Sequence, residues 1–131
     1  MNNEDLVRFN AIMKFMYDMA IAKSQKYGDS WKIDGLGPKS LFVEINAKFQ
    51  RLRHLLWEEG IHKKDPEEIH ELMTDIGVYS ILLIMKMELE MDSDMTRKYM
   101  EAIDARMKSN SMSIAQEYLQ RVAHYLYPDK E

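Results

Sequence analysis

The chain has 131 residues, of which 46% are hydrophobic and 31% are charged, a composition typical of a single globular domain with a buried core. Its formal net charge of −4 provides no basic surface for nucleic acid, so direct nucleic-acid binding is not expected. The lack of cysteine in the sequence excludes disulfides, thiolate metal sites and cysteine nucleophiles.

No charged-then-apolar signal pattern opens the chain, because charged side chains interrupt its first turns. The longest apolar stretch, residues 76–85, lies between Asp75 and Lys86 and is too short to span a bilayer. We therefore expect a cytoplasmic protein without membrane contact.

The first predicted element is an amphipathic helix over residues 3–27, because apolar residues recur there every three or four positions. The side chains of this stripe are Leu6, Phe9, Met13, Met16 and Ala20. Gly28 is expected to end the helix, and the turn-rich stretch 28–38 follows it. Such a loop is either a connector or a functional lid, and its length does not decide between them.

A second helix is predicted over about 39–59, with Gly60 as its stop. Its apolar side consists of Ile45, Phe49, Leu52, Leu55 and Leu56. A third helix is predicted over about 66–90, because Pro66 suits the first helical position after a capping Asp65. Its apolar residues are Ile69, Leu72, Met73, Ile76, Tyr79, Leu83 and Met87. They cover most sides of its later half, so we expect this helix to be the central one.

A fourth helix over about 94–108 follows a break at 92–94, and a fifth runs to about 126. Sustained alternation of apolar and polar residues is missing throughout the sequence, so strands are not expected. The sequence therefore predicts one all-α domain over 1–131, a bundle of four to five helices without a sheet.

Two rows of polar side chains stand on the second and third predicted helices. The third helix carries carboxylates four residues apart, at Glu67, Glu71 and Asp75. Because each step turns about 40° around the helix axis, this row drifts toward Tyr79 in the apolar run. The second helix carries a similar row of Glu44, Lys48 and Arg51. Two antiparallel helices would bring the rows together, with acids and bases bordering one cavity.

Facing rows of this kind suit phosphate chemistry. Mg²⁺ takes oxygen ligands, and a metal held by carboxylates bridges phosphate oxygens and activates water. Lys48 and Arg51 would neutralise phosphate charge beside it. The alternatives are structural, because Glu67 lies in a first helical turn, where a carboxylate favours the helix dipole. The other charges can equally pair with one another or face solvent, and the spacing alone leaves both interpretations open.

Three stretches of the chain resemble one family when taken in order. They are KYGDSW (26–31), SLFVEINAKFQRLRHLL (40–56) and EEIHELMTDIGVYSILL (67–83). They resemble the phage and bacterial nucleotide-modification-associated domains, which look like relatives of the MazG-type all-α nucleoside triphosphate pyrophosphohydrolases. The resemblance covers residues 26–90. It implies a dimeric or tetrameric helical bundle that hydrolyses nucleotides with Mg²⁺, in the host cytoplasm if the chain is phage-encoded.

Carried over residue by residue, the resemblance makes Glu44 a metal-holding acid of one helix, and Glu71 with Asp75 those of the next. This sequence departs from the family pattern at two points. Lys48 stands where an acid is expected, and Glu71 and Asp75 are four residues apart where the family has three. The departures motivate a second hypothesis, a nucleotide-binding bundle with reduced catalysis. A third hypothesis is a purely structural interaction bundle.

The first hypothesis is a Mg²⁺-dependent pyrophosphohydrolase that converts (deoxy)nucleoside triphosphates to monophosphate and pyrophosphate. It assigns catalysis to Glu44, Glu71 and Asp75, which with Glu67 also hold the metal. It assigns phosphate binding to Lys48 and Arg51, and shaping of the base pocket to Tyr27, Trp31 and Tyr79. Trp31 also suits a structural role as an anchor of its loop.

Overall fold

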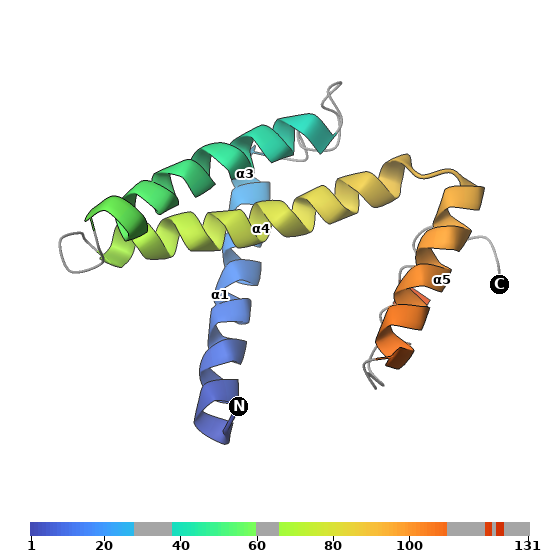
Figure 1. Cartoon of the computed structure of the whole chain (residues 1–131), viewed down its shortest axis with the longest axis horizontal. Helices are drawn as coiled ribbons and strands as arrows, with labels where there is room; N and C mark the ends of the chain where they lie inside the picture. Colours follow the sequence, from blue (N-terminus) through green and yellow to red (C-terminus); the bar gives the residue numbers. More distant parts are fainter. Residues whose placement is uncertain (28–37, 60–65, 110–119, 122, 125–131) are drawn as a thin grey trace. The chain divides into compact units, whose positions relative to one another are not determined.

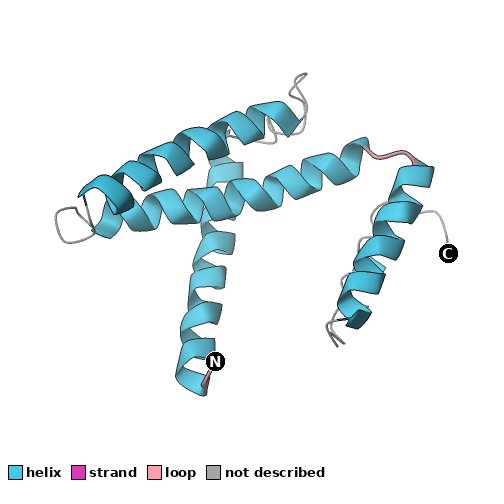
Figure 2. Ribbon diagram, in the orientation of Figure 1, coloured by secondary structure: helices cyan, strands magenta, loops and turns pink. Residues whose placement is uncertain are grey.

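The computed structural model describes residues 1–27, 38–59, 66–109, 120–121 and 123–124. Regular structure in these ranges is helical throughout, and no residue of these ranges lies in a strand (Figure 2). The predicted all-α fold is confirmed. None of the helices in the same ranges is both long enough and apolar enough to cross a bilayer.

Five helical elements follow one another along the described part of the chain (Figure 1). They are α1 (Asn3–Tyr27), α3 (Pro38–Arg53), the π-helical turn η1 (His54–Glu59), α4 (Pro66–Glu90) and α5 (Ser93–Ser109). The first and third predicted helices agree with α1 and α4 in their bounds. The second predicted helix corresponds to α3 continued by η1, and the fourth corresponds to α5.

Several predicted features lie outside the described residues. They are residues 28–37 of the turn-rich stretch 28–38, the stop at Gly60, the cap at Asp65 and most of the fifth helix. The last residue of that stretch, Pro38, begins α3. Of that fifth helix, residues 120–121 and 123–124 are described and are helical, in agreement with the prediction.

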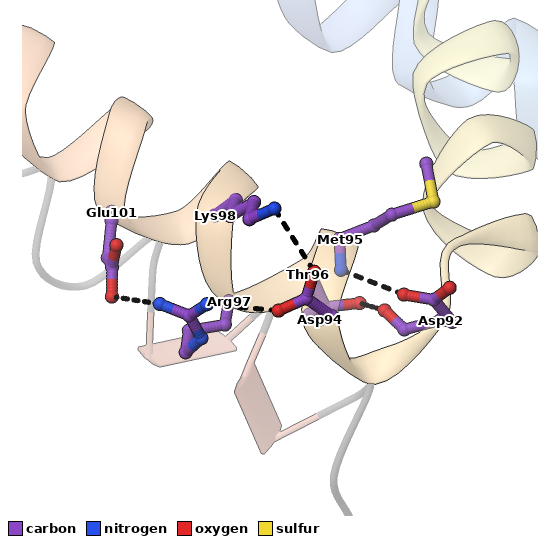
Figure 3. Close-up of polar contacts among 7 residues, drawn as sticks. All are labelled: Asp92, Asp94, Met95, Thr96, Arg97, Lys98 and Glu101. Atoms are coloured by element: carbon purple, nitrogen blue, oxygen red, sulfur yellow. Dashed lines mark hydrogen bonds and ion pairs between the residues drawn. The ribbon is translucent and has the colours of Figure 1, made fainter.

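Side-chain caps explain where two of the helices begin. The backbone N–H of Asp5 donates to Asn2 Oδ1 (2.8 Å), and the N–H of Asn2 donates to Asp5 Oδ2 (3.3 Å), which gives α1 a reciprocal cap. At α5, the N–H of Met95 donates to Asp92 Oδ1 (2.8 Å), and the hydroxyl of Thr96 donates to the Asp92 carbonyl (2.7 Å; Figure 3). The predicted break before the fourth helix is therefore the N-cap of α5.

The chain divides into two compact units, Met1–Lys86 and Met87–Glu131, and the single domain over 1–131 stays a prediction. The core of the first unit lies where α3 and η1 run beside α4 (Figure 1). Its buried residues are Leu52, Leu55 and Ile69, with Leu72 and Ile76 packed against them. The π-helical turn thus contributes Leu55, whose side chain is completely buried.

Helix α1 crosses α4 within the first unit (Figure 1). The rings of Phe15 and His70 meet edge to face, with centroids 5.1 Å apart. Nearby, a Cβ added to Gly77 would lie 2.8 Å from Met16 Cε, so the missing side chain allows the two helices to approach closely. Because α4 contacts both α1 and α3, it is the central helix of this unit, as predicted.

Part of each predicted apolar stripe is exposed. The exposed members are Leu6, Phe9 and Met13 on α1, Phe49 on α3, Leu56 on η1, and Met73 and Met87 on α4. On α3 and η1 the predicted members Leu52 and Leu55 are buried, and Leu41, outside the predicted stripe, is buried as well. Each predicted stripe is therefore buried only in part, because spacing identifies an apolar face without specifying how much of it a neighbour covers.

The second unit contains α5 and the end of α4. Arg97 lies between Asp94 (2.9 Å) and Glu101 (3.2 Å) in an ion-pair network on the exposed side of α5 (Figure 3). The hydroxyl of Tyr99 donates to Glu88 Oε2 (2.8 Å), which joins α5 to α4. Exposed ion pairs within one helix contribute little stability. We therefore expect the Asp92 cap and the hydrogen bond of Tyr99 to stabilise this unit more than the ion-pair network does.

Candidate functional site

The two polar rows predicted from the sequence face each other where α3 runs beside α4. The ammonium group of Lys48 donates to Asp75 Oδ2 (3.2 Å). One helical turn along α3, Arg51 pairs with Glu68 through Nε and Nη2, each 2.9 Å from Oε1. One ion pair, Lys48 with Asp75, therefore joins the two predicted rows, and Arg51 pairs with Glu68 next to the predicted Glu67. Ion pairs between these helices are also what the structural hypothesis expects.

A lysine of α1 also contacts the carboxylate of Asp75. Lys23 Nζ donates to Asp75 Oδ1 (2.7 Å), so both oxygens of Asp75 accept a hydrogen bond from a lysine. We call Lys23, Lys48 and Asp75 the lysine–aspartate cluster. Sequence reasoning missed Lys23, although a signal was present: it continues the stripe of Met16 and Ala20 at the same spacing, which places it on the packed face of α1.

Burial is uneven within the cluster. The side chains of Asp75, Lys48 and Lys23 are 10%, 25% and 40% exposed. Burial by itself raises the pKa of Asp75, but the hydrogen bonds from Lys23 and Lys48 outweigh it and hold that pKa below its ordinary value. The hydrogen bond to Asp75 also raises the pKa of Lys23. The cluster therefore contains two ammonium groups and one carboxylate, an excess of one positive charge.

The residues predicted to shape a base pocket are only partly described. Tyr79 is half-buried on α4, and its ring centroid lies 5.7 Å from Lys48 Nζ, within the range of a cation–π contact. The position of the Lys48 ammonium is thus set by both Asp75 and Tyr79. The side chain of Tyr27 and all of Trp31 lie outside the described residues.

The predicted metal-holding acids are not drawn together in the described ranges. Asp75 is buried, whereas Glu44, Glu67 and Glu71 are exposed. No three Asp, Glu or His side chains of these ranges form a group that could hold a metal ion. Because both oxygens of Asp75 already accept from ammonium groups, the acids as placed here do not fit a Mg²⁺ site. The magnesium ligands stay a prediction from the resemblance.

No protein-family model, curated protein or solved structure matches this chain. We therefore infer the function from the chemistry of the lysine–aspartate cluster. Two ammonium groups that share one partly buried carboxylate leave an excess positive charge, which suits an anionic ligand. The same contacts also tie α1 and α3 to α4.

Proposed function

We propose that this protein binds nucleotides through their phosphate groups at the lysine–aspartate cluster. The observation that supports the proposal is the excess of cations, since Lys23 and Lys48 share the single carboxylate of Asp75. Phosphate oxygens accept strong hydrogen bonds from ammonium groups, and a partly buried setting strengthens the attraction. Arg51, one turn further along α3, adds a planar guanidinium that matches two phosphate oxygens at once.

A second candidate function is Mg²⁺-dependent hydrolysis of (deoxy)nucleoside triphosphates to monophosphate and pyrophosphate. This candidate requires the carboxylates of α4 to hold a metal ion, and Asp75 would have to exchange its contacts with Lys23 and Lys48 for that ion. The resemblance to the MazG-type pyrophosphohydrolases supports the same chemistry. In this scheme Glu44 and Glu67 complete the set of acids.

The test is thermal unfolding of the full chain with a panel of ribo- and deoxynucleoside triphosphates, in EDTA and in Mg²⁺. A ligand present at 100 times its Kd stabilises the native state by about 2.7 kcal/mol, which raises the Tm measurably. Lys48→Gln should remove most of this shift. Lys14→Gln is the matched control, because Lys14 is an exposed lysine that pairs with Asp18 along α1.

Release of pyrophosphate is measured in the same samples. Release that requires Mg²⁺ and is lost in a folded Asp75→Asn variant would establish the second candidate. Binding without release would establish nucleotide binding alone. If no nucleotide shifts the Tm of the wild-type chain, the ion pairs serve only to join the helices and the proposal fails.

We propose further that the nucleotide-binding form is a homodimer or homotetramer, as the resemblance implies. Support comes from the large apolar side chains exposed along α1, which include Val7, Phe9, Met13 and Tyr17. Exposed apolar surface of this kind is typical of contacts between protein chains. Light scattering should give a multiple of the 15.5 kDa chain mass, and a 15.5 kDa particle at all concentrations would refute this.

A further inference from the structure

We propose that the lysine–aspartate cluster takes a phosphate group directly, without a divalent metal, and that Lys23 is one of the side chains that bind it. This inference rests on the proposed nucleotide binding and deepens it. The resemblance makes Asp75 a metal ligand and gives Lys23 no role. In our proposal both residues have other roles. Asp75 is the counter-ion that positions Lys23 and Lys48, and these two lysines bind the phosphate.

The donors of the cluster exceed what its carboxylate uses. A lysine ammonium carries three N–H donors, and Lys23 and Lys48 each direct one of them to Asp75. Because both ammonium groups contact the same carboxylate, they lie close enough together for one pyrophosphate unit to reach both. The remaining donors of each lysine can then meet phosphate oxygens while Asp75 keeps its place.

The charges of the cluster favour an anion over a divalent cation. Mg²⁺ at Asp75 would displace two hydrogen-bonded ammonium groups and then lie next to both of them. Like charges repel strongly in a partly buried setting, where the effective dielectric constant is well below that of water. A phosphate group meets a more favourable situation, because the two ammonium groups of the cluster face it, Asp75 is the carboxylate that both of them contact, and the nearby Glu71 is exposed to solvent.

Substitution of Asp75 separates the possible roles of the cluster. If Asp75 is a metal ligand, Asp75→Asn abolishes binding of the phosphates. If it is a counter-ion, Asp75→Asn removes the negative charge that directly contacts both lysines, and affinity is kept or increases. If the cluster only fastens helices together, the wild-type protein itself binds no phosphate.

The experiment is isothermal titration calorimetry of the full chain with inorganic pyrophosphate, in EDTA and in Mg²⁺, with circular dichroism to verify the fold of each variant. We expect binding in EDTA. Lys23→Gln and Lys48→Gln should each weaken it about tenfold or more, the loss expected of one charged hydrogen bond. Lys14→Gln should leave it unchanged, and Asp75→Asn should bind at least as tightly as the wild type.

Three results would overturn the inference. They are pyrophosphate binding that requires Mg²⁺ or does not occur, an unchanged affinity in Lys23→Gln, and a loss of affinity in a folded Asp75→Asn variant. If Asp75→Asn does not fold, the Lys23→Gln titration in EDTA decides. Nucleotides that bind only with Mg²⁺ would contradict this inference and leave the proposed function standing. If pyrophosphate binds through Lys23 in EDTA but no nucleotide binds, the inference stands and the proposed function fails.

Discussion

Replacement of Asp75 by asparagine should lower the free energy of unfolding at neutral pH by about 2 kcal/mol. The substitution keeps the size of the side chain and one carbonyl oxygen, but it removes the negative charge. Lys23 and Lys48 then lose the anion to which both donate. Two ammonium groups remain close together, with a neutral amide between them.

The magnitude follows from the exposure of the three side chains. A hydrogen bond to a charged group contributes about 1.5–3 kcal/mol when it is buried, and an exposed ion pair contributes about 0–1 kcal/mol. Asp75 is nearly buried, but Lys23 is 40% exposed and Lys48 is 25% exposed, so solvent screens both contacts in part. About 1 kcal/mol for each lysine gives the expected total of about 2 kcal/mol.

The effect should depend on pH with a definite sign. The folded state holds the pKa of Asp75 below its ordinary value, which is about 4. The ion pairs therefore contribute fully above pH 4, and their contribution is lost as the pH falls through the lower folded-state pKa. The difference in stability between wild type and Asp75→Asn should be constant from pH 7 to about pH 5 and should close below about pH 4.

Urea denaturation followed by circular dichroism at pH 7, 5 and 3 measures this difference. Asp18→Asn is the control, because Asp18 pairs with Lys14 on the exposed side of α1 and should contribute no more than about 0.5 kcal/mol. A difference for Asp75→Asn that is as large at pH 3 as at pH 7 would show that charge is not its cause. A difference no larger than that of Asp18→Asn would refute the argument altogether.

Four other substitutions probe the packing and the cap of α5. Gly77→Ala should change the free energy of unfolding by less than about 1 kcal/mol in urea denaturation. Alanine increases the helix propensity by about 1 kcal/mol, and the flexible end of Met16 can move away from the added Cβ. A loss of stability above about 2 kcal/mol would contradict this. Asp92→Ala should cost about 1 kcal/mol and speed amide hydrogen exchange in the first turn of α5 roughly fivefold, whereas unchanged exchange would argue against the cap. Leu55→Ala should cost about 2–5 kcal/mol and Leu56→Ala less than about 1 kcal/mol, and equal costs would place the core elsewhere.

The helices were predictable because the signals that begin and sustain them are local. Pro66 begins α4 at the predicted residue, and the apolar spacing of α1 extends over its observed length. What covers each apolar face is a property of the whole fold, so Phe9 and Phe49 belong to the predicted apolar stripes and are nevertheless exposed. The π-helical turn η1 was also missed, since its residues have the same apolar spacing as an ordinary helix end.

The candidate site was predictable in its location and only partly in its chemistry. Lys48 and Asp75 were expected on facing helices, and they are in contact. Lys23 was missed because its partner is 52 residues away, and no local pattern connects the two. Spacing also places the carboxylate of Asp75 near a packed face, but it does not show whether an ammonium group or a metal ion binds it there.

Asp75 has a further consequence for the order in which the helices assemble. Its contact with Lys48 closes 27 residues of chain, and its contact with Lys23 closes 52. Because the entropy of loop closure depends on the logarithm of loop length, the longer closure costs about 0.6 kcal/mol more. We therefore expect α3 and α4 to pair first, with one oxygen of Asp75 bonded to Lys48. When α1 docks, Lys23 donates a hydrogen bond to the second oxygen of Asp75. The carboxylate therefore favours a folding route in which the N-terminal helix joins last.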